Sequence, residues 1–248
     1  MRFYQALSQY YDVLFPSNPK QVKFIADRTR PGGSVLDVAA GTGETALALC
    51  QQGLNVSALD LDAGMVEGIR AKIGMQGRLG SLSAQVLDMR DLAVLAPARF
   101  DTVICIGNSI VHLDGIEEVR HVLKAMKARL QAGGSLILQT VNYDRILSEG
   151  IRELPLLEKP LAEGWIRFSR RYEPIGGKIR FIGLLEKETV GRKERWENAV
   201  ELLPLQAAEL SDALREAGFD ASSVTLYGSF AGESYRPDSP ALVVEAVQ

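Results

Sequence analysis

The first 140 or so residues alternate short apolar runs with longer amphipathic stretches. Each apolar run has the length of a buried strand and is bounded by Gly, Asp or Asn. Five such strands are expected, at residues 34–38, 56–60, 84–88, 101–106 and 135–141. Strands that alternate with helices in this way predict a parallel sheet with helices on both faces, which is a doubly wound α/β fold.

The clearest helical pattern lies between the fourth and fifth of these strands. Apolar side chains recur there at a spacing of three or four residues, which places them on one helix face; they are Ile116, Val119, Leu123, Met126 and Leu130. Asp114 followed by Glu117 predicts a capping-box start, and Gly133 predicts the end of this helix.

The pattern changes after residue 149. From Trp165 to Leu202 the apolar positions alternate with polar ones, and turn signals occur at Gly176-Gly177 and at Gly191. Period-two alternation with such turns predicts three antiparallel strands inserted late in the domain. Beyond Pro204 the sequence predicts one more helix, ending at Gly218, and two strands at 224–227 and 242–246 that complete the main sheet.

The stretch SVLDVAAGTGETALALCQQGLNVSALD, residues 34–60, carries the strongest functional signal. It joins a strand to a glycine loop, a helix and a second strand that ends on a carboxylate. Gly41 and Gly43 lack a Cβ, so a ligand can approach the backbone closely. Asp60 comes 19 positions after Gly41, at a strand end where an acid can accept hydrogen bonds from both ribose hydroxyls. A nucleoside-bearing cofactor is expected.

Charge separates the two cofactor classes that this loop could serve. The GxGxxA pattern from Gly41 to Ala46 also fits a dinucleotide, but a pyrophosphate would lie close to Asp37 and Glu44. Two carboxylates oppose an anion and favour the sulfonium and ammonium groups of S-adenosylmethionine. The acid-bearing strand that runs into GxG resembles the first motif of the class I S-adenosylmethionine-dependent methyltransferases.

This resemblance implies a seven-stranded Rossmann-like methyltransferase sheet and assigns residues to the cofactor. Asp60-Leu61 and Met65 resemble the second motif, which holds ribose and flanks adenine, and Asp88-Met89 resembles the motif that binds the adenine amino group. Asp62 is also expected to cap the next helix. The full expected cofactor set is Asp37, Ala39, Gly41, Thr42, Gly43, Asp60, Leu61, Met65, Asp88, Met89, Ile106 and Gly107.

Two short motifs resemble the glycine and sarcosine N-methyltransferase branch of that family. They are Gly107-Asn108-Ser109 with His112-Leu113, and Asn142-Tyr143-Asp144. The branch places an arginine, which binds the substrate carboxylate, directly before the second motif, whereas this chain has Val141. Asn108, His112 and Tyr10 are the residues expected at the reacting groups, because an amide, an imidazole and an aromatic face can all contact a cation or an acceptor.

The resemblance also implies a division of the chain. Residues 1–30 are expected to form a helical segment over the cofactor site, 31–148 and 204–248 the methyltransferase core, and 149–203 a flap over the substrate. Within it, residues 165–202 carry nine Lys and Arg residues, which are Arg167, Arg170, Arg171, Lys178, Arg180, Lys187, Arg192, Lys193 and Arg195. An anionic substrate is therefore one option, and a solvated strand face is the other.

Composition excludes several other classes. The chain has 248 residues, 46% of them hydrophobic, and a net charge of −3 with both signs interspersed, so neither a nucleic-acid footprint nor a membrane anchor is expected. The cysteines, Cys50 and Cys105, lack metal-ligand spacing, so we expect free buried thiols, no metal site and a cytoplasmic location.

The sequence therefore predicts a methyltransferase that uses S-adenosylmethionine and modifies a small molecule at nitrogen or oxygen. Three alternatives stay open at this stage. They are an NAD(P)-dependent oxidoreductase that uses the same glycines, an aminopropyl-transferring enzyme, and a non-catalytic nucleoside-binding domain.

Overall fold

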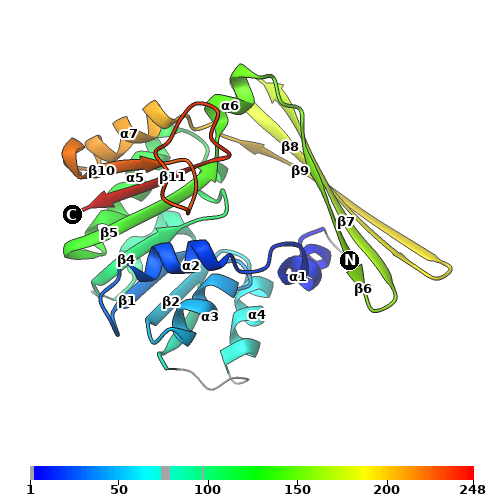
Figure 1. The fold of residues 1–248 in the computed structure, drawn as a ribbon, viewed down its shortest axis with the longest axis horizontal. Coiled ribbons are helices and arrows are strands. Elements are labelled where there is room, and N and C mark those ends of the chain that lie inside the picture. Colours follow the sequence, from blue (N-terminus) through cyan, green and yellow to red (C-terminus); the bar gives the residue numbers. More distant parts are fainter. Residues whose placement is uncertain (1–2, 74–78, 97) are drawn as a thin grey trace.

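A computed structural model of the chain describes residues 3–73, 79–96 and 98–248, so the first two residues of the predicted segment 1–30 lie outside it. The molecule contains a seven-stranded sheet and a separate four-stranded sheet that projects to one side of it (Figure 1). No helix in these described ranges is long and apolar enough to cross a membrane.

The main sheet has the strand order β10-β11-β5-β4-β1-β2-β3. Strands β1 to β5 pair in parallel, whereas β11 runs antiparallel to both β5 and β10. The strands are β1 Ser34–Val38, β2 Asn55–Asp60, β3 Leu82–Val86, β4 Phe100–Cys105, β5 Leu130–Val141, β10 Val224–Tyr227 and β11 Ala241–Val247. The predicted seven-stranded, doubly wound sheet is confirmed.

Helices cover both faces of this sheet (Figure 1). One apolar cluster joins the sheet to α5 and α7, and a second cluster joins it to α2, α3 and α4. The helices are α1 Phe3–Leu14, α2 Pro19–Ala26, α3 Glu44–Gln51, α4 Ala63–Ile73, α5 Ile116–Ala128, α6 Tyr143–Ser148 and α7 Ala207–Glu216, with short 3-10 helices η1 Met89–Val94, η2 Ile110–His112 and η3 Ala221–Ser223.

The inserted sheet has four strands rather than the three that the sequence predicts. Its antiparallel order is β6-β7-β8-β9, formed by β6 Glu153–Leu161, β7 Gly164–Ile175, β8 Lys178–Thr189 and β9 Arg192–Leu202. The additional strand β6 contains Pro155 and Pro160, which read as loop residues. Both prolines fit because β6 is an edge strand, where a missing N–H leaves no partner unpaired, and the pairing is irregular between Leu154 and Leu157.

The predicted limits of the long helix are wrong at both ends. Gly115, not Asp114, occupies the N-cap of α5, and the Asp114 N–H donates to Glu118 Oε2 at 2.9 Å. The helix ends at Ala128, and Gly133 lies within β5 with a φ of 73°. Leu130 continues the apolar pattern because it begins this buried strand, so periodicity alone extends the helix too far.

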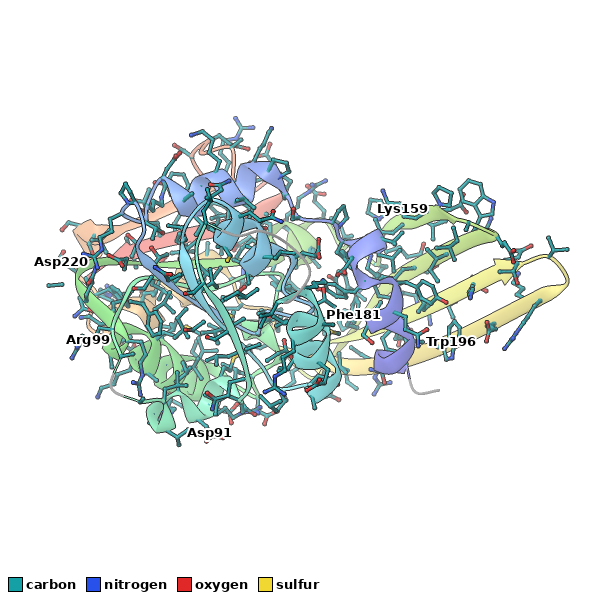
Figure 2. The ribbon with its side chains drawn as sticks, turned by 90° about the horizontal axis from the view of Figure 1, so that it is seen from below. Asp91, Arg99, Lys159, Phe181, Trp196 and Asp220 are labelled. Atoms are coloured by element: carbon teal, nitrogen blue, oxygen red, sulfur yellow. The ribbon has the colours of Figure 1, made fainter. Side chains whose placement is uncertain are left out.

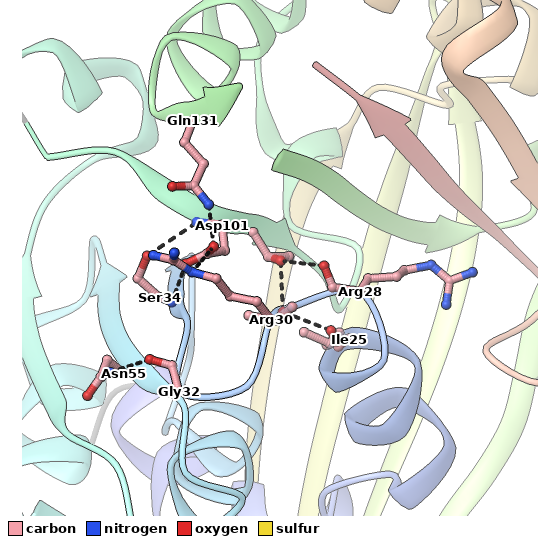
Figure 3. Close-up of polar contacts among 10 residues, drawn as sticks. Ile25, Arg28, Arg30, Gly32, Ser34, Asn55, Asp101 and Gln131 are labelled. Atoms are coloured by element: carbon pink, nitrogen blue, oxygen red, sulfur yellow. Dashed lines mark hydrogen bonds and ion pairs between the residues drawn. The ribbon is translucent and has the colours of Figure 1, made fainter. Parts of the chain in front are cut away.

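One buried carboxylate fixes the amino-terminal end of the main sheet (Figure 3). Asp101 on β4 is 5% exposed and accepts hydrogen bonds from the N–H of Ser34, at 2.7 Å, and from Gln131. The Arg30 guanidinium approaches the same carboxylate to 2.6 Å. Burial would raise the pKa of Asp101, but the hydrogen bonds from Ser34 and the Arg30 charge outweigh it and hold the pKa below its ordinary value.

Helix α1 lies between the two sheets (Figure 1). Its apolar face packs on β7 and β8, where Phe3 and Leu7 join Phe168 and Leu185 in a separate apolar cluster. Figure 2 shows Phe181 where the four-stranded sheet meets the rest of the molecule, and Trp196 farther out. The helix is therefore a shared wall between the main sheet and the inserted one.

Candidate functional site

A pocket of about 530 Å³ opens at the carboxyl ends of β1, β4 and β5. Strand order reverses between β1 and β4, and ligands of doubly wound sheets bind at such a switch point. The opposite wall consists of side chains from α1 and from β7, β8 and β9. The volume lies within the usual range for a small-molecule site.

The structure brings nine of the fifteen predicted site residues to this pocket. Those that line it are Asp37, Ala39, Gly41, Thr42, Met65, Ile106, Gly107, Asn108 and His112. Six lie outside its lining, and they are Tyr10, Gly43, Asp60, Leu61, Asp88 and Met89.

Asp37 is the most unusual group in the pocket. It is 1% exposed, and neither of its carboxylate oxygens has a hydrogen-bond partner among the described residues. Burial, and then the charge of Asp60, raise the pKa of Asp37 to about 7. A buried, unpaired carboxylate is unfavourable by itself, so this position is suited to a positively charged ligand.

Glu44 lines the pocket, but its negative charge is balanced by a lysine. Lys72 on α4 lies 2.7 Å from Glu44 and 2.7 Å from Asp12 on α1, and it donates to the Thr42 carbonyl at 2.9 Å. This corrects the prediction that Asp37 and Glu44 together would repel a phosphate. Only Asp37, reinforced by the nearby Asp60, carries that argument.

Asp60 holds the glycine loop in place. Its Oδ2 accepts from the Gly41 N–H at 2.8 Å, and its Oδ1 accepts from the Asp62 N–H at 2.9 Å. An ionised carboxylate has about four acceptor positions, so a ligand hydroxyl can still bind. Asp62 accepts from the Met65 N–H at 3.0 Å, which confirms its predicted capping role.

The two glycines of the loop differ in the space available for a side chain. At Gly41 (φ 58°) a Cβ would lie 3.7 Å from the Tyr11 ring, in ordinary contact beside the pocket. At Gly43 (φ 77°) a Cβ would lie 2.7 Å from Ile69 Cγ1, so this glycine serves the close packing of α3 on α4.

Asp88 is engaged within the protein. It caps η1, and its two oxygens accept from the backbone N–H and the Nη1 of Arg90, each at 2.9 Å. Leu61, in contrast, is 65% exposed beyond the end of β2.

Tyr11 rather than Tyr10 lines the pocket. Lys187 on β8 lies over the Tyr10 ring, 5.4 Å from its centroid, so Tyr10 faces the inserted sheet. Burial, and then the charges of Asp60, Asp12 and Asp37, raise the pKa of Tyr11, which keeps its hydroxyl neutral.

Two non-glycine residues in the described part of the chain adopt positive φ, and both line the pocket. They are Ala39 (φ 61°) after β1 and Asn108 (φ 69°) after β4. The Asn108 side chain accepts from the Val141 N–H and donates to the Tyr143 hydroxyl, both at 3.1 Å. Left-handed backbone costs about 1 kcal/mol for alanine, and such strain tends to occur at functional sites.

His112 closes the pocket from η2 and remains accessible to solvent. Burial of part of its ring lowers its pKa below the ordinary value. The imidazole is therefore neutral at neutral pH and can accept a proton.

Sequence reasoning did not single out several lining residues. Gln139 on β5 accepts from the Gly107 N–H at 2.8 Å, and no pattern marks this mid-strand amide. Arg170 is one of the nine basic residues considered for an anionic substrate, and period-two alternation distinguishes it from its neighbours, because it shares a strand face with Phe168 and Tyr172, both buried.

Known proteins resemble this chain in sequence and in fold. A family model described as Methyltransferase domain matches residues 35–134. A glycine/sarcosine N-methyltransferase from Aphanothece halophytica is 30% identical over 217 residues, which cover 83% of this chain and 72% of that protein. A second protein of that name, from Parasynechococcus marenigrum (strain WH8102), is 38% identical, but the match covers only 47% of this chain and 41% of the relative.

Among solved structures, the SAM-bound amino pentose methyltransferase CalS10 from Micromonospora echinaspora superposes with a TM-score of 0.75 at 20% identity. The match covers 100% of this chain and 98% of that one, so the two share their fold. With the sequence match to a relative over most of both chains, the family is established: this chain belongs to the class I S-adenosylmethionine-dependent methyltransferases.

Proposed function

We propose that this methyltransferase transfers the methyl group of S-adenosylmethionine to a nitrogen or oxygen atom of a small molecule, and that the strand-end pocket holds both reactants. The observation that carries the proposal is Asp37 on the pocket wall, a fully buried carboxylate that has no hydrogen-bond partner among the residues that the structure describes. A cationic cofactor supplies the opposite charge that this group lacks.

The residues present fit the cofactor. Asp37 would face its positive groups, and the open space beside Gly107 leaves room for a ligand against the backbone. Asp60 keeps lone pairs for the ribose hydroxyls while its other lone pairs fix the loop. The dinucleotide alternative requires an anion next to Asp37, so we do not favour it.

The adenine end is less enclosed. We assign Met65, which is 7% exposed and lines the pocket, to one face of the base, with Leu61 as the exposed cover. Asp88 and Met89 stay in the proposal as neighbours of the adenine amino group, although the ion pair with Arg90 competes for the Asp88 carboxylate.

When bound, the cofactor supplies an electrophilic methyl group on a positively charged sulfur. The protein's part is to align the acceptor and exclude water, which can contribute most of the rate of such a displacement. Tyr11 and Phe15 border the pocket from the amino-terminal segment, and Phe168 and Phe181 border it from the inserted sheet. We therefore assign residues 1–30 to covering the cofactor and 149–203 to covering the substrate.

His112 is the residue we assign to proton removal from the acceptor. It lines the pocket near the loop after β4, and its lowered pKa keeps the ring neutral. Asn108 acts differently, since both ends of its amide bind the protein and hold the Gly107 loop against β5. Asn108 is thus a positioning residue in this proposal.

Calorimetry with S-adenosylmethionine, S-adenosylhomocysteine and NADH tests the cofactor assignment. Asp60→Ala should weaken binding of both adenosyl ligands roughly 10- to 100-fold, because two hydrogen bonds to a charged group are lost. Glu67→Ala, on the exposed face of α4, is the control. Micromolar affinity for NADH without S-adenosylhomocysteine binding would contradict the proposal, and so would equal affinities of Asp60→Ala and the parent.

The reaction is tested with labelled S-adenosylmethionine and a panel of small amines and phenols. Transfer of label to at least one acceptor, reduced in His112→Gln, is the expected result. Cofactor binding without transfer to any member of a broad panel would favour a non-catalytic ligand-binding domain.

A further inference from the structure

One row of residues crosses the inserted sheet on the face that lines the pocket. Leu154 on β6 pairs with Arg170 on β7, Arg170 pairs with Gly183 on β8, and Gly183 pairs with Asn198 on β9. Leu154, Arg170 and Asn198 all border the pocket. Gly183 has no side chain, and a Cβ there would lie 3.0 Å from the rings of Phe3 and Phe168. Arg170 and Asn198 are therefore the polar members of this row.

The Arg170 guanidinium is anchored but not neutralised. Its Nη2 donates to the Pro155 carbonyl at 2.7 Å, which holds the side chain against the irregular part of β6. Its Nε is buried without a hydrogen-bond partner among the described residues. Six other cations of this sheet each have a carboxylate partner, and they are Arg167, Arg171, Lys178, Arg192, Lys193 and Arg195.

Arg170 is also the sole Lys or Arg among the described residues that line this pocket. A single guanidinium presents two parallel N–H groups and one positive charge, which match a carboxylate better than a phosphate dianion. The rows on either side are apolar, with Phe168 opposite Leu185 and Tyr172 opposite Phe181. A substrate held here must therefore place hydrocarbon against those side chains.

We propose that Arg170 binds a carboxylate of the methyl acceptor, and that the acceptor combines this single negative charge with an apolar or aromatic body. The inference rests on the proposed function, since it assigns the substrate half of the same pocket. It also distinguishes this chain from a protein that binds glycine alone, because the walls that flank Arg170 are aromatic.

Binding to the enzyme saturated with S-adenosylhomocysteine tests the proposal by calorimetry. The probes are phenylacetate, 3-phenylpropionate and benzoate, their uncharged amides, and acetate as a carboxylate without an apolar body. We expect at least one aromatic acid to bind roughly 10- to 100-fold more tightly than both its amide and acetate. Binding of none of the acids, or equal binding of acids and amides, would overturn the proposal.

Variants test whether Arg170 causes the preference for acid over amide. Arg170→Gln should remove the preference for acid over amide, and Arg170→Lys should keep part of it because the charge remains but the fork is lost. Arg171→Gln is the matched control, since Arg171 is exposed on the opposite strand face and pairs with Glu173. An acid preference that survives in Arg170→Gln refutes the role of Arg170.

S-adenosylhomocysteine affinity is measured first for every protein. Parent enzyme that fails to bind it contradicts the proposed function. Normal cofactor binding without an acid preference contradicts only the assignment of Arg170. An Arg170→Gln protein that cannot bind the cofactor is misfolded, and the acid-to-amide ratio of the parent then decides.

Discussion

Replacing Asp37 with asparagine should make the ligand-free protein more stable and should lower its affinity for the cofactor. Burial raises the pKa of this carboxylate from its ordinary 3.8 to about 7. Since each pKa unit corresponds to about 1.4 kcal/mol, ionised Asp37 destabilises the fold by about 4 kcal/mol at pH 8. A buried asparagine without partners costs about 1–3 kcal/mol, so the expected net gain is about 1–3 kcal/mol.

The sign of the pH dependence makes the prediction specific. Well below pH 3.8 the carboxyl group is protonated in both folded and unfolded chains, so it does not change the free energy of unfolding. Between pH 4 and about 7 only the unfolded chain ionises, so the parent loses stability relative to Asp37→Asn by about 1.4 kcal/mol per pH unit. Above about pH 7 both states are ionised and the difference becomes constant.

Urea unfolding of parent and variant across pH 4–8.5 measures this difference. Asp212→Asn, on the exposed surface of α7, controls for the loss of one negative charge. Calorimetry should show S-adenosylmethionine bound about 10- to 100-fold more weakly by Asp37→Asn. A greater loss for S-adenosylmethionine than for S-adenosylhomocysteine would place Asp37 at the sulfonium. A stability difference that stays flat from pH 4 to 7, together with unchanged affinity, would refute the reasoning.

Other substitutions test the packing, the backbone strain and the buried carboxylate that support the site. Gly43→Ala should cost about 1–3 kcal/mol, measured by urea unfolding, and should cost less in an Ile69→Ala background, because Ile69 Cγ1 is the atom nearest to the added Cβ. Ala39→Gly should raise stability by up to about 1 kcal/mol, since φ is 61° there; a loss would show that no strain is stored. Asp101→Ala should cost about 2–4 kcal/mol at pH 7, and the difference from the parent should shrink as pH falls below about 4, because a lowered pKa stabilises only the ionised form.

The sequence predicts the main sheet well because parallel strands buried on both faces must be short continuous apolar runs. It predicts where the pocket opens for the same reason, since Gly41 and Gly107 follow strands that end at one edge. It fails at β6, where the two prolines are tolerated at an edge position that only the tertiary structure reveals.

The wall opposite the strand ends could be predicted only in part. Tyr10 and Tyr11 are adjacent, so they point about 100° apart on α1, and sequence alone does not say which of them faces the ligand. The charge of Glu44 depends on Lys72, which is 28 positions away and on another helix. Alternation distinguishes Arg170 from its neighbours, but only the folded sheet shows that its Nε has no hydrogen-bond partner within the described residues.

Helix α1 has a consequence for how this enzyme could be re-engineered. Its Asp12 pairs with Lys72, which donates to the Thr42 carbonyl in the glycine loop. Its Phe3 and Leu7 pack against the inserted sheet. In the proposed arrangement the methyl donor and the acceptor lie on either side of this helix, so widening the space for one shifts the wall of the other. Libraries aimed at new acceptors should therefore vary the strand faces while leaving this helix untouched, or turnover will fall for reasons unrelated to acceptor fit.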